Sequence, residues 1–189
     1  MNKSLLLLCS VLLSWNVNAR DVSDVRVAES AQVGGATLQL NGAGTRTRVI
    51  IDVYVAALYL GTKTHNAGDV LADAGAKRVA LHMLYGMSSG KLLDAFKTAI
   101  EANHSPAELS ALDAQLKKFY AIFGAISAIN NGDVILLDYL PATGTKITIN
   151  GAERGVVEGA EMNRALLKIW LGSNPVQNDL KKDMLGIKS

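Results

Sequence analysis

Two arginines, Arg46 and Arg48, stand at the entrance to one of the most apolar runs of the chain, in the segment LNGAGTRTRVIIDVYVAALYL of residues 40–60. A guanidinium presents a planar fork of donors that binds an anionic oxygen pair through two hydrogen bonds. The preceding glycines do not form a dinucleotide loop, because Gly42 and Gly44 are followed by no third glycine until Gly61. The arginine side chains are therefore the candidate chemistry of this segment.

The backbone that carries these arginines is predicted to be extended. They alternate with threonines, and the residues after them are β-branched or aromatic, which favours a strand. Side chains two apart on a strand share a face, so Arg46 and Arg48 point the same way if no bulge intervenes. We expect Arg48 to face solvent or a neighbour in the sheet.

The remaining reactive residue types predict neither a metal site nor a nucleophile. The histidines, at positions 65, 82 and 104, lack ligand spacing, and Cys9 is the only cysteine. No serine has the surroundings of a nucleophile elbow. Acids and bases are interspersed, with 19 Lys and Arg against 17 Asp and Glu, which does not favour nucleic acid. We expect no cofactor, no metal and no nucleic-acid partner.

The first nineteen residues resemble a secretory signal peptide. Lys3 precedes a hydrophobic run too short to span a bilayer, and Val17 and Ala19 occupy the positions that a signal peptidase reads. We expect cleavage after Ala19, a periplasmic location, and one domain over residues 20–189. No later segment is long and apolar enough to span a membrane. The sequence leaves the oligomeric state open.

Periodicity and punctuation predict an α+β fold, an antiparallel sheet with helices gathered on one face. A capping box at Ser105 starts one helix, and Asn150-Gly151 is the strongest hairpin signal in the chain. The expected elements are strands within 20–60 with a turn at 34–35, a strand over 78–85, a helix from 88 or 89, a helix from 105 to near 130, strands at 134–140 and 145–149, a helix over 160–171, and a helix capped by residues 174–177 and ending at 186.

Three blocks in register resemble the bacterial, exported branch of the chalcone isomerase-like family. They are NGAGTR followed by VYVAALYL, then GDVILLDYLPATGTKITINGAE, then NRALLKIWLGSNPVQNDLKKDMLG. The resemblance implies an open-faced β-sandwich, a large antiparallel sheet packed against a layer of helices with a ligand cleft between them. It also implies that Arg46 is the arginine that faces this cleft.

The resemblance implies binding more than catalysis. Plant enzymes of the family close a flavanone ring with the cleft arginine and four further polar residues, whose places here fall on Tyr54, near Gly90 and Lys97, and on Asn163. Other branches resemble plastid fatty-acid-binding proteins, in which the arginine, often with a tyrosine, holds a carboxylate. We therefore predict no catalytic residues and a small apolar or amphipathic ligand, such as a fatty acid. The predicted ligand-binding residues are Arg46, Tyr54, Lys97 and Asn163.

Several alternatives remain open at this point. Arg46 pairs with an internal acid in a purely structural interpretation, for which Glu158, Glu161 and Asp138 are available. Tyr54 and Tyr85 are then core aromatics, and Trp170 is core or cleft wall. The alternative function is an isomerase, an intramolecular lyase acting on a chalcone-like or other phenolic or enone substrate. A third interpretation is a scaffold whose cleft is filled by side chains.

Overall fold

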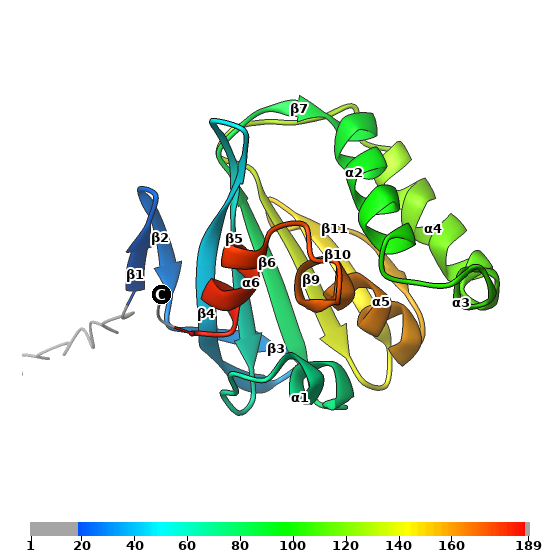
Figure 1. The fold of residues 1–189 in the computed structure, drawn as a ribbon, viewed down its shortest axis with the longest axis horizontal. Coiled ribbons are helices and arrows are strands. Elements are labelled where there is room, and N and C mark those ends of the chain that lie inside the picture. The colour runs from blue at the N-terminus through cyan, green and yellow to red at the C-terminus, as the bar shows by residue number, and fades with distance from the viewer. Residues whose placement is uncertain (1–18, 188–189) are drawn as a thin grey trace, which may run out of the picture.

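The computed structural model describes residues 19–187 and is built on one curled antiparallel sheet of seven strands (Figure 1). Across the sheet the strand order is β11-β10-β9-β6-β5-β4-β3. The strands are β3 (Ser30–Val33), β4 (Ala36–Arg48), β5 (Ile51–Leu60), β6 (Lys77–Met83), β9 (Val134–Leu140), β10 (Gly144–Ile149) and β11 (Ala152–Val157). The predicted α+β class with an antiparallel sheet is confirmed.

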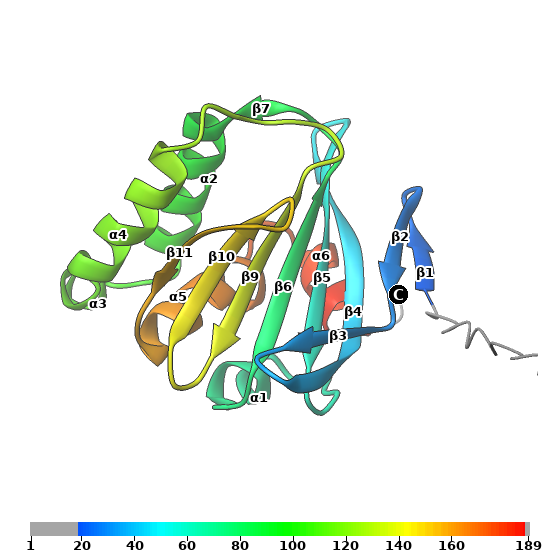
Figure 2. The same cartoon turned by 180° about the vertical axis from the view of Figure 1, so that it is seen from behind.

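Helices cover one face of this sheet. In Figure 1 α5 and α6 lie over the face turned to the viewer, and α2, α3 and α4 form a group on the β11 side. Seen from behind, in Figure 2, the strands lie in front of α5 and α6. The helices are α1 (Ala67–Ala72), α2 (Ser89–Glu101), α3 (Pro106–Ala111), α4 (Asp113–Gly124), α5 (Ala160–Leu171) and α6 (Asn178–Met184). None of the helices within residues 19–187 has the length and apolar character needed to cross a bilayer.

Two hydrophobic clusters lie on opposite faces of the sheet. The larger one joins the sheet to the helices and includes an aromatic group in which Phe96 packs against Phe119, Phe123 and Trp170. The smaller one, around Leu38, Leu40 and Tyr59, includes Val27 of β2 (Val25–Ala28). That strand pairs with β1 (Ala19–Val22), and a second short ladder joins β7 (Met87–Ser88) to β8 (Ala128–Ile129).

Some of the helix boundaries predicted from the sequence are observed in the structure, and others differ. The capping box at Ser105 is formed, and α5 ends at Gly172 as predicted. The helix expected from residue 105 to near 130 is instead two helices that meet at Leu112, and α4 ends at Gly124. Residues 174–177 do not cap α6 through a side chain. Gln177 occupies the N-cap position, but its side chain makes no capping hydrogen bond.

The glycines of the NGAG segment form a seat for α6. A Cβ at Gly42 would overlap the carbonyl oxygen of Asp183, and one at Gly44 would overlap the carboxylate of the same residue. Beside them, the buried Asn41 donates from Nδ2 to the carbonyl of Met184 at 2.9 Å and accepts at Oδ1 from the amide of Thr64 at 2.8 Å. Asn41 and the two glycines therefore fix α6 against β4, which answers why small residues precede the arginines.

Candidate functional site

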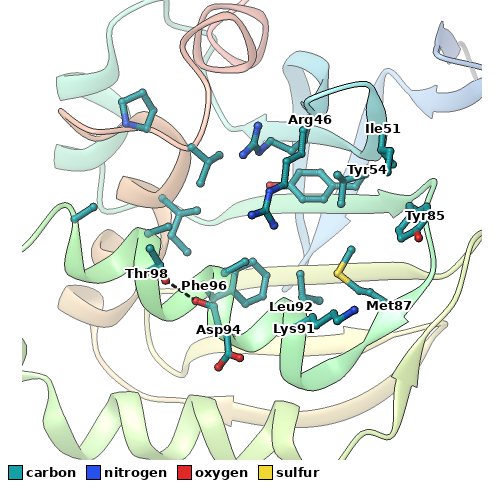
Figure 3. A pocket seen from close by; sticks show the side chains of 18 of the residues that line it. Arg46, Ile51, Tyr54, Tyr85, Met87, Lys91, Leu92, Asp94, Phe96 and Thr98 are labelled. Carbon is teal, nitrogen blue, oxygen red and sulfur yellow. Dashed lines mark hydrogen bonds between the residues drawn. The ribbon is translucent and has the colours of Figure 1, made fainter.

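A cleft of about 980 Å³ opens between the β4–β5 hairpin, α2 and the α5–α6 connection (Figure 3). Its volume is at the upper end of the range for small-molecule sites. The lining residues are Arg46, Arg48, Ile51, Val53 and Tyr54, then Tyr85, Gly86 and Met87, then Lys91, Leu92, Asp94, Ala95, Phe96, Thr98, Ala99 and Ala102, and finally Ile169, Asn174, Pro175 and Val176.

Arg46 reaches the cleft from β4 and is half-buried. Its Nη1 donates to the carbonyl of Thr47 at 2.7 Å and to Oε1 of Gln177 at 3.2 Å. The same Gln177 oxygen accepts from the amide of Thr47 at 3.0 Å. The N-cap residue of α6 and the backbone of β4 therefore both fix the position of the guanidinium. Both acceptors are neutral, and no carboxylate of residues 19–187 forms a salt bridge with Arg46.

The three acids that offered a structural partner for Arg46 are engaged elsewhere. Glu158 accepts from Lys118 Nζ at 2.6 Å, and Glu161 pairs with Arg164 one turn further along α5. Asp138, which is 3% exposed, accepts from both Nε and Nη2 of Arg78. Within the described residues the guanidinium of Arg46 is therefore a positive charge that faces the cleft without a salt-bridge partner.

Tyr54 lies directly opposite Arg46 in the β4–β5 register. Its side chain is buried, and its Oη accepts a hydrogen bond from Nε1 of Trp170 at 3.1 Å. Since the indole N–H can only donate, the tyrosine hydroxyl keeps its own hydrogen, for which residues 19–187 offer no acceptor. Burial raises the pKa of Tyr54, against smaller lowering effects from the Trp170 hydrogen bond and the Arg46 charge. At neutral pH this hydroxyl is a donor beside the guanidinium.

The opposite wall of the cleft is apolar and its rim is basic. Helix α2 begins after Ser88, whose Oγ accepts from the amide of Lys91 at 3.3 Å, and it presents Leu92 and Phe96 to the cleft. Arg46, Arg48 and Lys91 are the basic lining residues, and Asp94 is the acidic one. An apolar wall with an excess of positive charge suits an amphipathic anion.

The predicted ligand-binding residues divide into two groups. Arg46 and Tyr54 come together at the cleft, but Lys97 and Asn163 do not line it. The ammonium of Lys97 lies 4.9 Å from the ring centroid of Tyr120, on the side of α2 that faces α4. Asn163 is buried, and its Nδ2 lies 3.4 Å from Oγ1 of Thr145, which also is buried.

The position of Tyr85 and the strand alternation of Arg46 and Arg48 also differ from what the sequence predicted. The strand predicted over residues 78–85 ends at Met83, because the amides of Leu84 and Tyr85 both donate to the carbonyl of Val53. Tyr85 thus leaves the core for the rim of the cleft, where it is 49% exposed. A register shift after Arg46 interrupts the alternation between Arg46 and Arg48, yet both line the cleft, with Arg48 exposed at its edge.

Some features of the site have no clear sequence signal. Lys91 and Gln177 are polar residues in helical or pre-helical segments, and their roles depend on how α2 and α6 are placed against β4. Trp170 is fully buried behind Tyr54 and belongs to the core, one of the two positions expected for it. His65 and His104 each bond a backbone carbonyl, and no cluster of three metal-binding side chains occurs in the described part of the chain.

The sequence and the fold both resemble those of known proteins. A family profile described as chalcone isomerase-like matches residues 19–186, nearly all of the part that the structure describes. The chain belongs to the chalcone isomerase-like family. The open-faced arrangement of sheet, helices and intervening cleft is the fold that the sequence resemblance implied.

Among solved structures, this chalcone isomerase-like chain is similar to a fatty-acid binding protein of Arabidopsis thaliana. The two superpose with a TM-score of 0.60 at 18% sequence identity, over 83% of this chain and 96% of the plant protein. At that identity the likeness concerns the fold. No curated protein sequence matches the chain.

Proposed function

We propose that the protein binds a small apolar carboxylate such as a fatty acid in the cleft, without turning it over. The observation that carries this proposal is the guanidinium of Arg46, which faces an apolar cleft with neutral hydrogen-bond partners only. A carboxylate there gains two charge-assisted hydrogen bonds from Arg46 and a third from Tyr54. The similar plant structure is that of a fatty-acid binding protein, which agrees in chemistry.

The proposal is for binding because the cleft offers few groups for chemistry. Gly90, Lys97 and Asn163, which occupy the places of ring-closing polar residues by resemblance, do not line the cleft. The hydroxyl of Tyr54 is buried with a raised pKa, which disfavours the phenolate that a general base needs. The apolar wall of α2 instead matches an acyl chain.

A titration with dodecanoate and with dodecanol tests the function. The two ligands share the alkyl chain and differ in charge, so the neutral alcohol cannot form an ion pair with Arg46. Loss of one partner of a buried charge pair costs about 2 kcal/mol or more, so we expect dodecanoate to bind at least roughly thirtyfold more tightly. Equal affinities, or no saturable binding of dodecanoate, would contradict the proposal.

We further propose that the chain is exported to the periplasm and that residues 1–19 are removed. The support is the leader pattern of Lys3, the hydrophobic run, and small or apolar residues at Val17 and Ala19. The family match begins at residue 19, so most of the leader lies outside the matched region. N-terminal sequencing of the protein isolated from its host should give Arg20 as the first residue. A product that starts at Met1 would refute this proposal.

A further inference from the structure

The turn of the β4–β5 hairpin carries the most exposed of the large hydrophobic side chains among residues 19–187. Val49 is 92% exposed and Ile50 is 89% exposed. They are the two turn residues between the last β4–β5 pair, Arg48 and Ile51. In Figure 1 this tip projects beyond the end of the sheet, close to β7.

The backbone at this tip is also unfavourable for these residues. Val49 has a φ of 61°, in the left-handed region, where a β-branched residue is an outlier. The β10–β11 hairpin of the same chain uses Asn150 and Gly151 for its positive φ values of 51° and 79°, the residues that such turns favour. Only the first residue of this turn, Val49, has a positive φ, so glycine there and a polar residue at position 50 would remove both the strain and the exposed apolar surface. That the tip keeps both indicates a function for Val49 and Ile50.

The tip lies at the mouth of the ligand cleft. Ile51 and Arg48 flank the turn and also line the cleft, and Tyr85 and Lys91 lie on the same rim. Figure 3 shows Ile51 and Tyr85 at one end of the cleft, with Lys91 on α2 across from them. The nearby acid of the hairpin, Asp52, accepts a hydrogen bond from Oγ1 of Thr47 at 2.6 Å. Aliphatic, aromatic and basic side chains together are typical of surfaces that enter the interface of an anionic bilayer.

We propose that the β4–β5 tip inserts Val49 and Ile50 into an anionic lipid bilayer and so places the cleft mouth against the membrane surface. Docking there would let an amphipathic ligand pass between bilayer and cleft without crossing water. This purpose rests on the proposed fatty-acid binding, whereas the docking itself does not. A bilayer fits the tip better than a protein partner, because a stable protein interface buries about 800 Å² on each side and the exposed aliphatic side chains here are two residues at the end of one hairpin.

The double variant Val49→Gly, Ile50→Asn separates docking from folding and from ligand binding. Glycine suits the positive φ at position 49, so the thermal midpoint should be equal or higher. Neither side chain lines the cleft, so affinity for dodecanoate in buffer should not change. Binding to vesicles containing about one third phosphatidylglycerol should fall by about tenfold or more, because two apolar side chains leave the bilayer.

A control variant and a control lipid complete the test. Ile187→Asn also removes an exposed aliphatic side chain, but near the C-terminus of the chain, and it should leave vesicle binding unchanged. Wild-type protein should bind phosphatidylcholine vesicles more weakly than the anionic ones, with the difference reduced by salt. Wild-type protein that does not bind anionic vesicles, or a double variant that binds them like wild type, overturns the docking. If wild-type protein does not bind dodecanoate, the proposed function is overturned instead. The two outcomes are distinguishable, because vesicle binding is measured without fatty acid.

Discussion

Arg46→Met is expected to lower the affinity for dodecanoate by about 2–5 kcal/mol, the range for removing one partner of a buried charge pair. The same change should cost the ligand-free protein about 1 kcal/mol or less. Arg46 has no acidic partner within the described residues, and the substitution removes hydrogen bonds to the neutral oxygens of Thr47 and Gln177. Methionine preserves much of the length and the apolar stem of arginine. Calorimetric titration and thermal unfolding measure the two effects.

The matched control for this variant is Arg26→Met. Arg26 is an exposed arginine on β2, so its replacement changes the net charge equally without touching the cleft. We expect its affinity for dodecanoate to equal that of wild type. An affinity loss shared by both variants would show that the effect is one of overall charge. A large loss of stability in Arg46→Met alone would contradict the absence of an acidic partner for Arg46 within the fold.

Arg78→Met, unlike Arg46→Met, should strongly destabilise the fold, by about 3–5 kcal/mol. Arg78 on β6 is opposite Asp138 on β9, and its guanidinium holds that buried carboxylate through two nitrogens. Methionine in its place leaves Asp138, 3% exposed, as a buried charge without a counterion. Denaturant unfolding at neutral pH measures the loss.

A double substitution separates loss of the pair from loss of packing. In Arg78→Met combined with Asp138→Leu no charge is left unpaired, so stability should recover relative to Arg78→Met. If Arg78→Met is as stable as wild type, the ion pair does not hold this part of the sheet. The contrast between Arg78 and Arg46 is the main structural argument for a ligand at Arg46, because both are strand arginines and only Arg78 has an internal acid.

Local patterns predicted much of the fold. The capping box at Ser105, the Asn150-Gly151 turn and the end of α5 at Gly172 depend on interactions within a few residues. Arg46 was recognisable because an arginine at the head of an apolar strand is unusual and the family resemblance placed it at a cleft. Each of these features depends on residues that are close together in the sequence, so the local sequence was enough to predict it.

Features that depend on long-range placement were not predictable in the same way. Successive residues of an α-helix point about 100° apart, so a register uncertainty of a residue or two in the resemblance leaves open which side of α2 a residue faces. Lys97 lies on the side towards Tyr120, whereas Phe96 faces the cleft. Tyr85 left the core because its amide shares the carbonyl of Val53. Helix α1 was missed, since its six residues form about one and a half turns and bury a single side chain, Val70.

A crystal structure of the complex with dodecanoate would show whether a fatty-acid carboxylate binds between Arg46 and Tyr54. We expect carboxylate oxygens within about 3 Å of the guanidinium of Arg46 and the hydroxyl of Tyr54, with the alkyl chain along Leu92 and Phe96. A carboxylate bound at Arg48 or Lys91 on the rim, with the interior of the cleft empty, would contradict it.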